Sequence, residues 1–187
     1  KIDPQCSGFD EAYATVRKQI DHIIENVRRI SYNLRPATLD DLGLSASLAG
    51  LVKDILEPNA IVCELSIDFN DTCFSSEEQM LLYRIVQEAF FNIAKHSKAD
   101  QVSVHIMQDS EAVRVCIEDN GIGFDYGQEH GRSSLKKNLG LSAMQERALM
   151  VGGLLHINTG PGQGTRVSIE IQGKGEGHAE MPSRACR

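Results

Sequence analysis

The chain has 187 residues, of which 41% are hydrophobic and 24% are charged. These proportions are ordinary for a globular protein and exclude a collagenous or largely disordered chain. No apolar run reaches the roughly 18 residues that a membrane span requires. The net charge is −7, so we expect no direct nucleic-acid partner, because DNA and RNA phosphates attract basic surfaces. The 5 cysteines include no Cys-x-x-Cys pair and predict neither a disulfide framework nor a zinc site.

Residues 1–35 predict a long helix that packs against other helices. Apolar residues from Phe9 to Leu34 recur at spacings of four and three, which is the heptad pattern. An amphipathic helix lying on its own domain is the alternative. Pro36 ends the pattern, and residues 36–60 are expected to form a connecting segment with a short helix around 44–56. The chain begins at Lys1 without a Met or a signal-peptide pattern, so we interpret it as a piece of a longer protein.

Residues 61–172 alternate between strand and helix patterns, and we expect them to form one domain. Strand patterns lie at residues 61–69, 102–106, 113–117, 154–158 and 165–171. Helical patterns lie at residues 75–97, which start with a capping box, and at residues 141–150. This order predicts an α+β fold, a two-layer α/β sandwich with helices over one face of a mixed sheet. The polar segment 125–138 is expected to be a mobile loop, and residues 173–187 a disordered tail.

One face of the helix predicted at 75–97 has side chains suited to a metal-bound nucleotide. Glu88, Asn92 and His96 recur every four residues and therefore project from one face, with Lys95 beside them. The Asn92 amide and the Glu88 carboxylate offer the oxygen ligands that Mg²⁺ prefers, while Lys95 or His96 could meet phosphate oxygens. A solvated polar stripe on a surface helix is the alternative.

A second candidate feature directly follows the strand pattern at 113–117. In the segment Asp-Asn-Gly-Ile-Gly-Phe, the carboxylate of Asp119 can accept a hydrogen bond from an exocyclic amine. Gly121 and Gly123 allow the backbone to approach a ligand closely, because they carry no Cβ. A tight turn after a strand is the alternative. Tyr126 occupies the position of the third glycine of a dinucleotide-binding fingerprint, which argues against that fold.

Two further segments could contact phosphate or base. Gly140 and Leu141 stand at the start of a predicted helix, where free backbone N–H groups and the helix dipole favour phosphate. The glycine-rich segment 160–165 could be a second close-approach loop, although a plain hairpin turn explains it equally and it lacks the ending of a P-loop. Basic residues of the loop at 125–138 could meet phosphate charge, or could simply be solvated. They are Arg132, Lys136 and Lys137.

The order of these features resembles the GHKL ATP-binding domain, or Bergerat fold, shared by gyrase, certain chaperones, histidine kinases and MutL. The resemblance covers residues 61–171 and implies helices layered over a mixed sheet, with ATP and Mg²⁺ as the bound groups. It implies that Asn92 coordinates Mg²⁺, that Asp119 binds the adenine amine and that Gly140 lines the phosphates. The remaining implied contacts are the nucleotide wall at Gly121 and Gly123 and an adenine-side hydrogen bond from Thr165.

Two motifs narrow the resemblance to one family. The sequence Gln-Glu-Ala-Phe-Phe-Asn-Ile-Ala-Lys-His-Ser at 87–97 is similar to the N-box of two-component sensor histidine kinases. Leu-Arg-Pro at 34–36 and Leu-Asp-Asp-Leu-Gly-Leu at 39–44 are similar to the nitrate-sensor-type subfamily. The resemblance implies that residues 1–35 are the second helix of a bundle through which the parent protein forms a homodimer. It also implies a cytoplasmic domain whose parent is anchored in the bacterial plasma membrane.

In this family the parent protein transfers the γ-phosphoryl group of ATP to a histidine and then to a response regulator with a DNA-binding output domain. Glu88 could polarise the attacking group. The phosphoacceptor histidine of the subfamily is followed by an acidic residue, and none of the 6 histidines here is. We therefore expect this chain to bind ATP without phosphorylating itself. The alternatives are a GHKL-type ATPase, an anti-sigma-like serine kinase, and a nucleotide-binding dimerisation module without catalysis.

Overall fold

The computed structural model describes Val16 and residues 36–125 and 138–173. The chain divides into two compact units, Lys1–Ala37 and Thr38–Arg187, and the fold described here is that of the second unit. Apart from Val16, the predicted heptad helix lies outside the described residues. So do most of the predicted loop at 125–138, with its three basic residues, and nearly all of the predicted tail.

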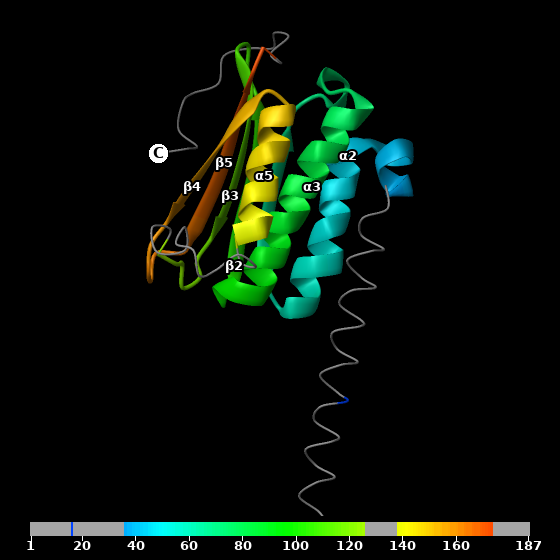
Figure 1. Ribbon diagram of the computed structural model, residues 1–187. Helices are drawn as coiled ribbons and strands as arrows, with labels where there is room; N and C mark the ends of the chain where they lie inside the picture. The colour runs from blue at the N-terminus through cyan, green and yellow to red at the C-terminus, as the bar shows by residue number, and fades with distance from the viewer. Residues whose placement is uncertain (1–15, 17–35, 126–137, 174–187) are drawn as a thin grey trace, which may run out of the picture. The chain divides into compact units, whose positions relative to one another are not determined.

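Five strands form one mixed sheet in the order β1-β2-β3-β5-β4 (Figure 1). The strands are β1 (Val62–Asp68), β2 (Gln101–Gln108), β3 (Ala112–Asp119), β4 (Gly153–Thr159) and β5 (Thr165–Gln172). β1 runs parallel to β2, and the other neighbouring strands are antiparallel. Because β5 pairs antiparallel with β3, the last residue of β3, Asp119, lies opposite the first residue of β5, Thr165.

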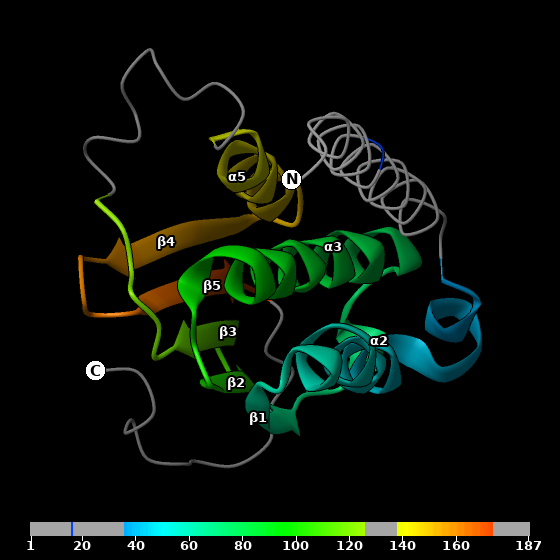
Figure 2. The same cartoon turned by 90° about the horizontal axis from the view of Figure 1, so that it is seen from below.

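In the described part of the chain, three helices cover one face of this sheet, as Figure 2 shows. They are α2 (Ala37–Leu51), α3 (Ser76–Asn92) and α5 (Asn138–Met150). Shorter helical turns are η1 (Val52–Leu56), η2 (Glu57–Asn59), η3 (Asp71–Cys73) and η4 (Ile93–Ser97). The predicted two-layer arrangement of helices over a mixed sheet is confirmed. No helix in the described part of the chain is both long and apolar enough to cross a membrane.

Helix α3 lies over the middle of the sheet. A capping box defines where the helix begins, and its apolar face packs into the core. Ser75 and Glu78 form the predicted capping box: the Ser75 N–H donates to Glu78 Oε2 at 2.8 Å, and the Glu78 N–H donates to Ser75 Oγ at 3.3 Å. Ile85 and Phe90 are fully buried at 0% exposure. The π turn η4 extends the helix to Ser97, so the predicted range of 75–97 is matched closely.

Helix α2 packs into the same hydrophobic core. Its leucines Leu39, Leu44, Leu48 and Leu51 are all buried in the cluster that includes α3 and the sheet. The helix begins at Ala37 instead of near residue 44, because a non-helical Gly43 (φ 80°, ψ −180°) joins two helical stretches into one element. Residues 36–60, expected as a connecting segment, therefore contribute part of the core.

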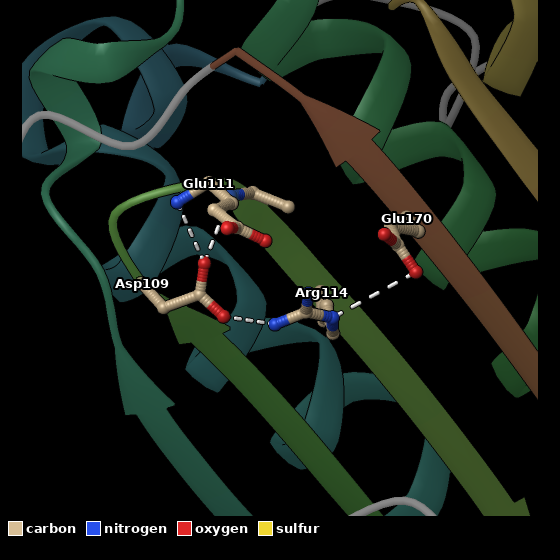
Figure 3. Close-up of polar contacts among 5 residues, drawn as sticks. Asp109, Glu111, Arg114 and Glu170 are labelled. Atoms are coloured by element: carbon tan, nitrogen blue, oxygen red, sulfur yellow. Dashed lines mark hydrogen bonds and ion pairs between the residues drawn. The ribbon is translucent and has the colours of Figure 1, made fainter. Parts of the chain in front are cut away.

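The outward face of the sheet carries charged side chains, and Figure 3 shows one such cluster around the β2–β3 turn. Asp109 Oδ1 accepts hydrogen bonds from the N–H groups of Glu111 at 2.8 Å and Ala112 at 2.9 Å. Arg114 pairs with Asp109, and its Nε lies 3.7 Å from Glu170 Oε2 on β5. The cluster stabilises the turn at the end of β3 that lies away from Asp119.

Candidate functional site

The site is centred on Asp119, the only buried acidic side chain in the described part of the chain, with 4% of its surface exposed. The Gly121 N–H donates to Asp119 Oδ1 at 2.8 Å, and the hydroxyl and backbone N–H of Thr165 also bond to the carboxylate. Burial raises the pKa of the Asp119 carboxyl, while the hydrogen bonds from Gly121 and Thr165 act in the opposite direction. A carboxylate has about four acceptor positions, so these three donors leave room for one more.

Glycines bring three loops into backbone contact around Asp119. A Cβ on Gly121 would overlap the carbonyl oxygen of Ser97, at the end of η4. A Cβ on Gly123, which has a φ of 58°, would overlap the carbonyl oxygen of Gly160 in the β4–β5 turn. Only glycine permits these approaches, since any other residue places a carbon where the neighbouring backbone lies. The Asp-x-Gly-x-Gly spacing is therefore required by packing between loops.

Backbone hydrogen bonds hold the same loops together. The Ile122 N–H donates to the Ser97 carbonyl at 2.7 Å, and the Gly162 N–H donates to the Ile122 carbonyl at 2.6 Å. The Phe124 N–H donates to Thr159 Oγ1 at 3.1 Å. Ser97 and Thr159 are not among the residues predicted for the site. In the sequence, only their positions next to the site loops indicate a role.

Asn120, which directly follows Asp119 in the motif, has a structural role. Its side-chain oxygen accepts hydrogen bonds from the N–H groups of Asp100 and Gln101, both at 3.1 Å. Its amide nitrogen donates to the Asp100 carboxylate at 2.6 Å. Asn120 thereby ties the start of β2 to the end of β3 and keeps Asp119 in place.

The second group of predicted residues lies where α3 meets α5. Glu88 and Asn92 stand one turn apart on α3 and are both half-buried. Gly140 lies against Glu88, so closely that a Cβ at position 140 would overlap Glu88 Oε1. Within the described residues, neither Glu88 nor Asn92 forms a side-chain hydrogen bond or ion pair. Their oxygens are hard donors, and this donor set fits Mg²⁺.

The other residues predicted for the phosphate end have different environments. The side chain of Leu141 packs against the hydrophobic core, so its backbone N–H in the first turn of α5 is the part suited to phosphate. Lys95 is exposed on η4, with Nζ 5.3 Å from the centroid of the Phe91 ring. His96 is exposed and has no side-chain hydrogen bond among the described residues. The structure thus joins Asp119, Gly121 and Thr165 in one cluster, and Glu88 and Gly140 in another.

Residues 77–174 match the family of histidine kinase-, DNA gyrase B- and HSP90-like ATPases. The chain belongs to this family. The family match covers α3 from Glu77 onward, the Asp119 motif and β5, and these include the features on which the resemblance in the sequence rests. Membership in this family of ATPases implies the use of ATP.

The relatives are sensor histidine kinases. Sensor histidine kinase MctS of Rhizobium johnstonii is 38% identical over 157 residues, which cover 82% of this chain and 33% of the relative. Histidine-protein kinase/phosphatase DegS of Brevibacillus brevis is 38% identical over 167 residues, covering 88% of this chain and 42% of the relative. The chain therefore spans less than half the length of these curated relatives.

The solved structures that are similar agree with this assignment. The blue-light activated histidine kinase of Erythrobacter litoralis EL346 is 25% identical, with a TM-score of 0.56. The similarity covers 68% of this chain and 41% of that one. This chain corresponds to the ATP-binding region of the sensor histidine kinases, as the motifs at 87–97 and 119–124 predict.

Proposed function

We propose that this domain binds ATP through Asp119, whose remaining acceptor position receives a hydrogen bond from the exocyclic amine of adenine. The observation that supports this most is the environment of Asp119: a buried carboxylate held by Gly121 and Thr165. A guanine base presents a carbonyl oxygen where adenine presents its amine, and that oxygen would repel the carboxylate. The site should therefore prefer ATP to GTP. Gly121 and Gly123 form the wall beside the base, and Thr165 adds a hydrogen bond on the adenine side.

The phosphate end of the site would be built from α3 and α5. The oxygens of Asn92 and Glu88 would hold Mg²⁺, which when bound neutralises part of the triphosphate charge. The backbone N–H groups of Gly140 and Leu141 would donate to phosphate oxygens at the positive end of the α5 dipole. Lys95 and His96, both exposed, would add positive charge or hydrogen bonds to the same oxygens.

In the parent protein the proposed reaction is phosphoryl transfer to a histidine. The imidazole nitrogen attacks the γ-phosphorus, the bond between that phosphorus and the β–γ bridging oxygen breaks, and ADP leaves. Glu88 would accept a hydrogen bond from the other ring nitrogen and so polarise the attacking imidazole. The phosphoryl group would then pass to an aspartate of a response regulator with a DNA-binding output domain. This chain's own histidines are not expected to serve as the acceptor.

The proposed assembly follows the sensor kinase pattern. Residues 1–35 would supply the second helix of a dimerisation bundle, so that the parent forms a homodimer. Residues 36–60 would connect this helix to the ATP-binding domain of residues 61–172. The domain would lie in the cytoplasm, with its parent anchored in the plasma membrane. The expected partners are a second copy of the parent and the response regulator, with no direct contact to nucleic acid.

Calorimetric titration of the chain with Mg-ATP and with Mg-GTP tests the nucleotide site. We expect ATP to bind and GTP to bind far more weakly. Asp119→Asn should weaken ATP binding about 10- to 100-fold, since a hydrogen bond to a charged acceptor contributes about 1.5 to 3 kcal/mol. Asn92→Ala should weaken binding only when Mg²⁺ is present. Equal affinity for ATP and GTP, or an unchanged affinity in Asp119→Asn, contradicts the proposal.

Phosphoryl transfer is tested by incubating the chain and labelled ATP with a separate polypeptide that carries a phosphoacceptor histidine. Acid-labile label on that polypeptide supports the kinase. Release of inorganic phosphate without label indicates a hydrolase, and acid-stable label indicates a serine kinase. Binding of ATP with neither product indicates a nucleotide-binding module. Acid-labile label on the isolated chain would contradict the expectation that it cannot phosphorylate itself.

A further inference from the structure

The carboxylate of Glu88 on α3 occupies the space that a side chain at Gly140 would fill. A Cβ built on Gly140 would overlap Glu88 Oε1 and lie 3.1 Å from Glu88 Cδ. Helices α3 and α5 are packed side by side, as both ribbon views show (Figures 1 and 2). Gly140 thus marks the point where the first turn of α5 makes room for an acidic side chain of α3.

Gly140 differs from the site's other glycines in what a Cβ would meet. At Gly123 and Gly164 the added carbon would overlap backbone oxygens, so the loops themselves would have to move. At Gly140 it would meet the far end of a flexible side chain, and Glu88 alone could turn away. Gly140 also has no positive φ, so its backbone conformation is open to any residue. A Gly140→Ala variant should therefore fold normally and displace only the Glu88 carboxylate.

Nothing else in the described part of the chain fixes this carboxylate. Glu88 is half-buried, yet it has no hydrogen bond or ion pair among the described residues. Its position is therefore set by the backbone of α3 and by the space it fills beside Gly140. A carboxylate that accepts no hydrogen bond from the described residues keeps acceptor positions available to a reacting group.

We propose that Gly140 is a positioning residue for phosphoryl transfer and that it acts through Glu88. The absent side chain lets the Glu88 carboxylate rest against the first turn of α5, where it can orient the attacking imidazole. This inference rests on the proposed function and gives Gly140 a role besides the phosphate contact implied by the family. A catalytic group moved by about 1 Å can lose a large part of its effect.

A double-mutant cycle separates the two roles of Gly140. The variants are Gly140→Ala, Glu88→Gln and the double variant, and Glu88→Gln keeps the shape of the side chain while removing its charge. Two quantities are measured: the affinity for ATP by calorimetry, with and without Mg²⁺, and the turnover of labelled ATP onto the separate histidine-bearing polypeptide. Gly50→Ala serves as the matched control, because Gly50 lies in helix α2 and its added Cβ would meet nothing within 4 Å.

We expect Gly140→Ala to slow transfer about 10- to 100-fold. The dissociation constant for ATP measured without Mg²⁺ should change less than about twofold, because the backbone N–H of residue 140 is kept, whereas displacement of Glu88 should weaken binding further only when Mg²⁺ is present. In the Glu88→Gln background, adding Gly140→Ala should change the rate less than about twofold, because the two residues act as one unit. Gly50→Ala should match the wild type in both measurements. Circular dichroism and thermal unfolding should show Gly140→Ala to be as stable as the wild type.

The inference is overturned if Gly140→Ala leaves the rate unchanged, or if it weakens ATP binding equally in both backgrounds. The second outcome would mean that Gly140 acts on the phosphates directly. Failure of the proposed function is distinguishable, because then the wild-type chain itself would bind no ATP or transfer no label.

Discussion

The Oγ of Ser45 donates a hydrogen bond of 2.7 Å to the carboxylate of Asp71, which lies 26 residues further along the chain. The Ser45 N–H also donates to Asp71, at 3.3 Å, so this carboxylate caps the helical stretch that restarts after Gly43. Gly43 has a φ of 80°, and a Cβ there would overlap the Asp71 carboxylate. The Leu-Gly-Leu motif at 42–44 therefore forms a bend, and Asp71, from the segment before α3, caps the helical stretch that follows it.

Removing this cap should destabilise the domain. Asp71→Ala is expected to lower the free energy of unfolding by about 1 to 2 kcal/mol, the usual cost of losing a helix cap. Gly43→Ala should cost more than Asp71→Ala, because it adds strain at positive φ to a collision with the carboxylate. Chemical denaturation monitored by circular dichroism measures both.

Asp41→Ala is the matched control for this cap. Asp41 lies exposed on the same helix and has no hydrogen bond or ion pair in the described part of the chain. Its removal should change the free energy of unfolding by less than about 0.5 kcal/mol. If Asp71→Ala and Asp41→Ala unfold at the same denaturant concentration, the capping role assigned to Asp71 is wrong.

The elements of this fold could be predicted because most carry a local signal. The capping residues Ser75 and Glu78 stand three positions apart in the sequence, and buried residues alternate with less buried ones along most of β2. The pairing of β5 with β3 could not be predicted from such patterns, because nothing near Thr165 indicates that Asp119 is its partner. Sheet order depends on contacts between distant segments.

Part of the candidate site could also be proposed from the sequence. The chemistry of Asp119, Asn92 and Glu88 follows from their side chains, and the family resemblance named their roles. The contributions of Ser97 and Thr159 could not be predicted. The Ser97 carbonyl and the Thr159 hydroxyl acquire their partners only through the packing of the loops, which no local sequence pattern indicates. The sequence predicts a phosphate contact at Gly140, whereas the proximity of Gly140 to Glu88 depends on the packing of α3 against α5.

The ionised carboxylate of Asp119 should lower the free energy of unfolding at neutral pH. Burial raises the pKa of Asp119 above its ordinary value of 3.8, so the unfolded chain holds the ionised form more readily than the folded chain. The resulting cost is present above the folded pKa and disappears as the pH falls through that pKa toward 3.8. Asp119→Asn should therefore be at least as stable as the wild type at pH about 7 while losing ATP affinity.

Thermal unfolding of both proteins across a series of pH values checks this. The difference in melting temperature should favour Asp119→Asn most at neutral pH and shrink in acid. A difference that stays constant with pH would show that Asp119 does not titrate differently in the folded and unfolded states.

Asp109 should have the opposite effect on stability. The N–H groups of Glu111 and Ala112, with Arg114, lower the pKa of the Asp109 carboxyl below its ordinary value of 3.8 (Figure 3). Its stabilising contribution is therefore fully present above pH 3.8 and is lost as the pH falls through the lowered pKa. Because the group is exposed, Asp109→Asn should destabilise the domain by less than about 1 kcal/mol at neutral pH.

The same pH series, with Asp109→Asn added, measures this effect. The wild type should be the more stable protein at neutral pH, and the two should converge in strong acid. High salt should also reduce the difference, since the Arg114 pair is exposed to solvent. If Asp109→Asn is more stable than the wild type at neutral pH, the assigned direction is wrong.

Gly162 and Gly164 in the β4–β5 turn offer a matched test of the loop packing around Asp119. Both have positive φ, 76° and 70°, so alanine at either position introduces a similar backbone strain of about 1 to 2 kcal/mol. A Cβ on Gly162 would meet nothing within 4 Å, whereas a Cβ on Gly164 would overlap the carbonyl oxygen of Asp119. Only Gly164→Ala should therefore displace the Asp119 carboxylate, which we propose binds adenine.

We expect Gly164→Ala to weaken ATP binding at least about tenfold, and Gly162→Ala to leave the dissociation constant within about twofold, because strain without displacement affects folding more than recognition. Calorimetry with Mg-ATP measures the affinities, and denaturant unfolding measures the shared cost of strain. Equal losses of affinity in the two variants would attribute the effect to strain in the turn. A loss confined to Gly164→Ala means that close contact between the turn and the end of β3 holds Asp119 in its binding position.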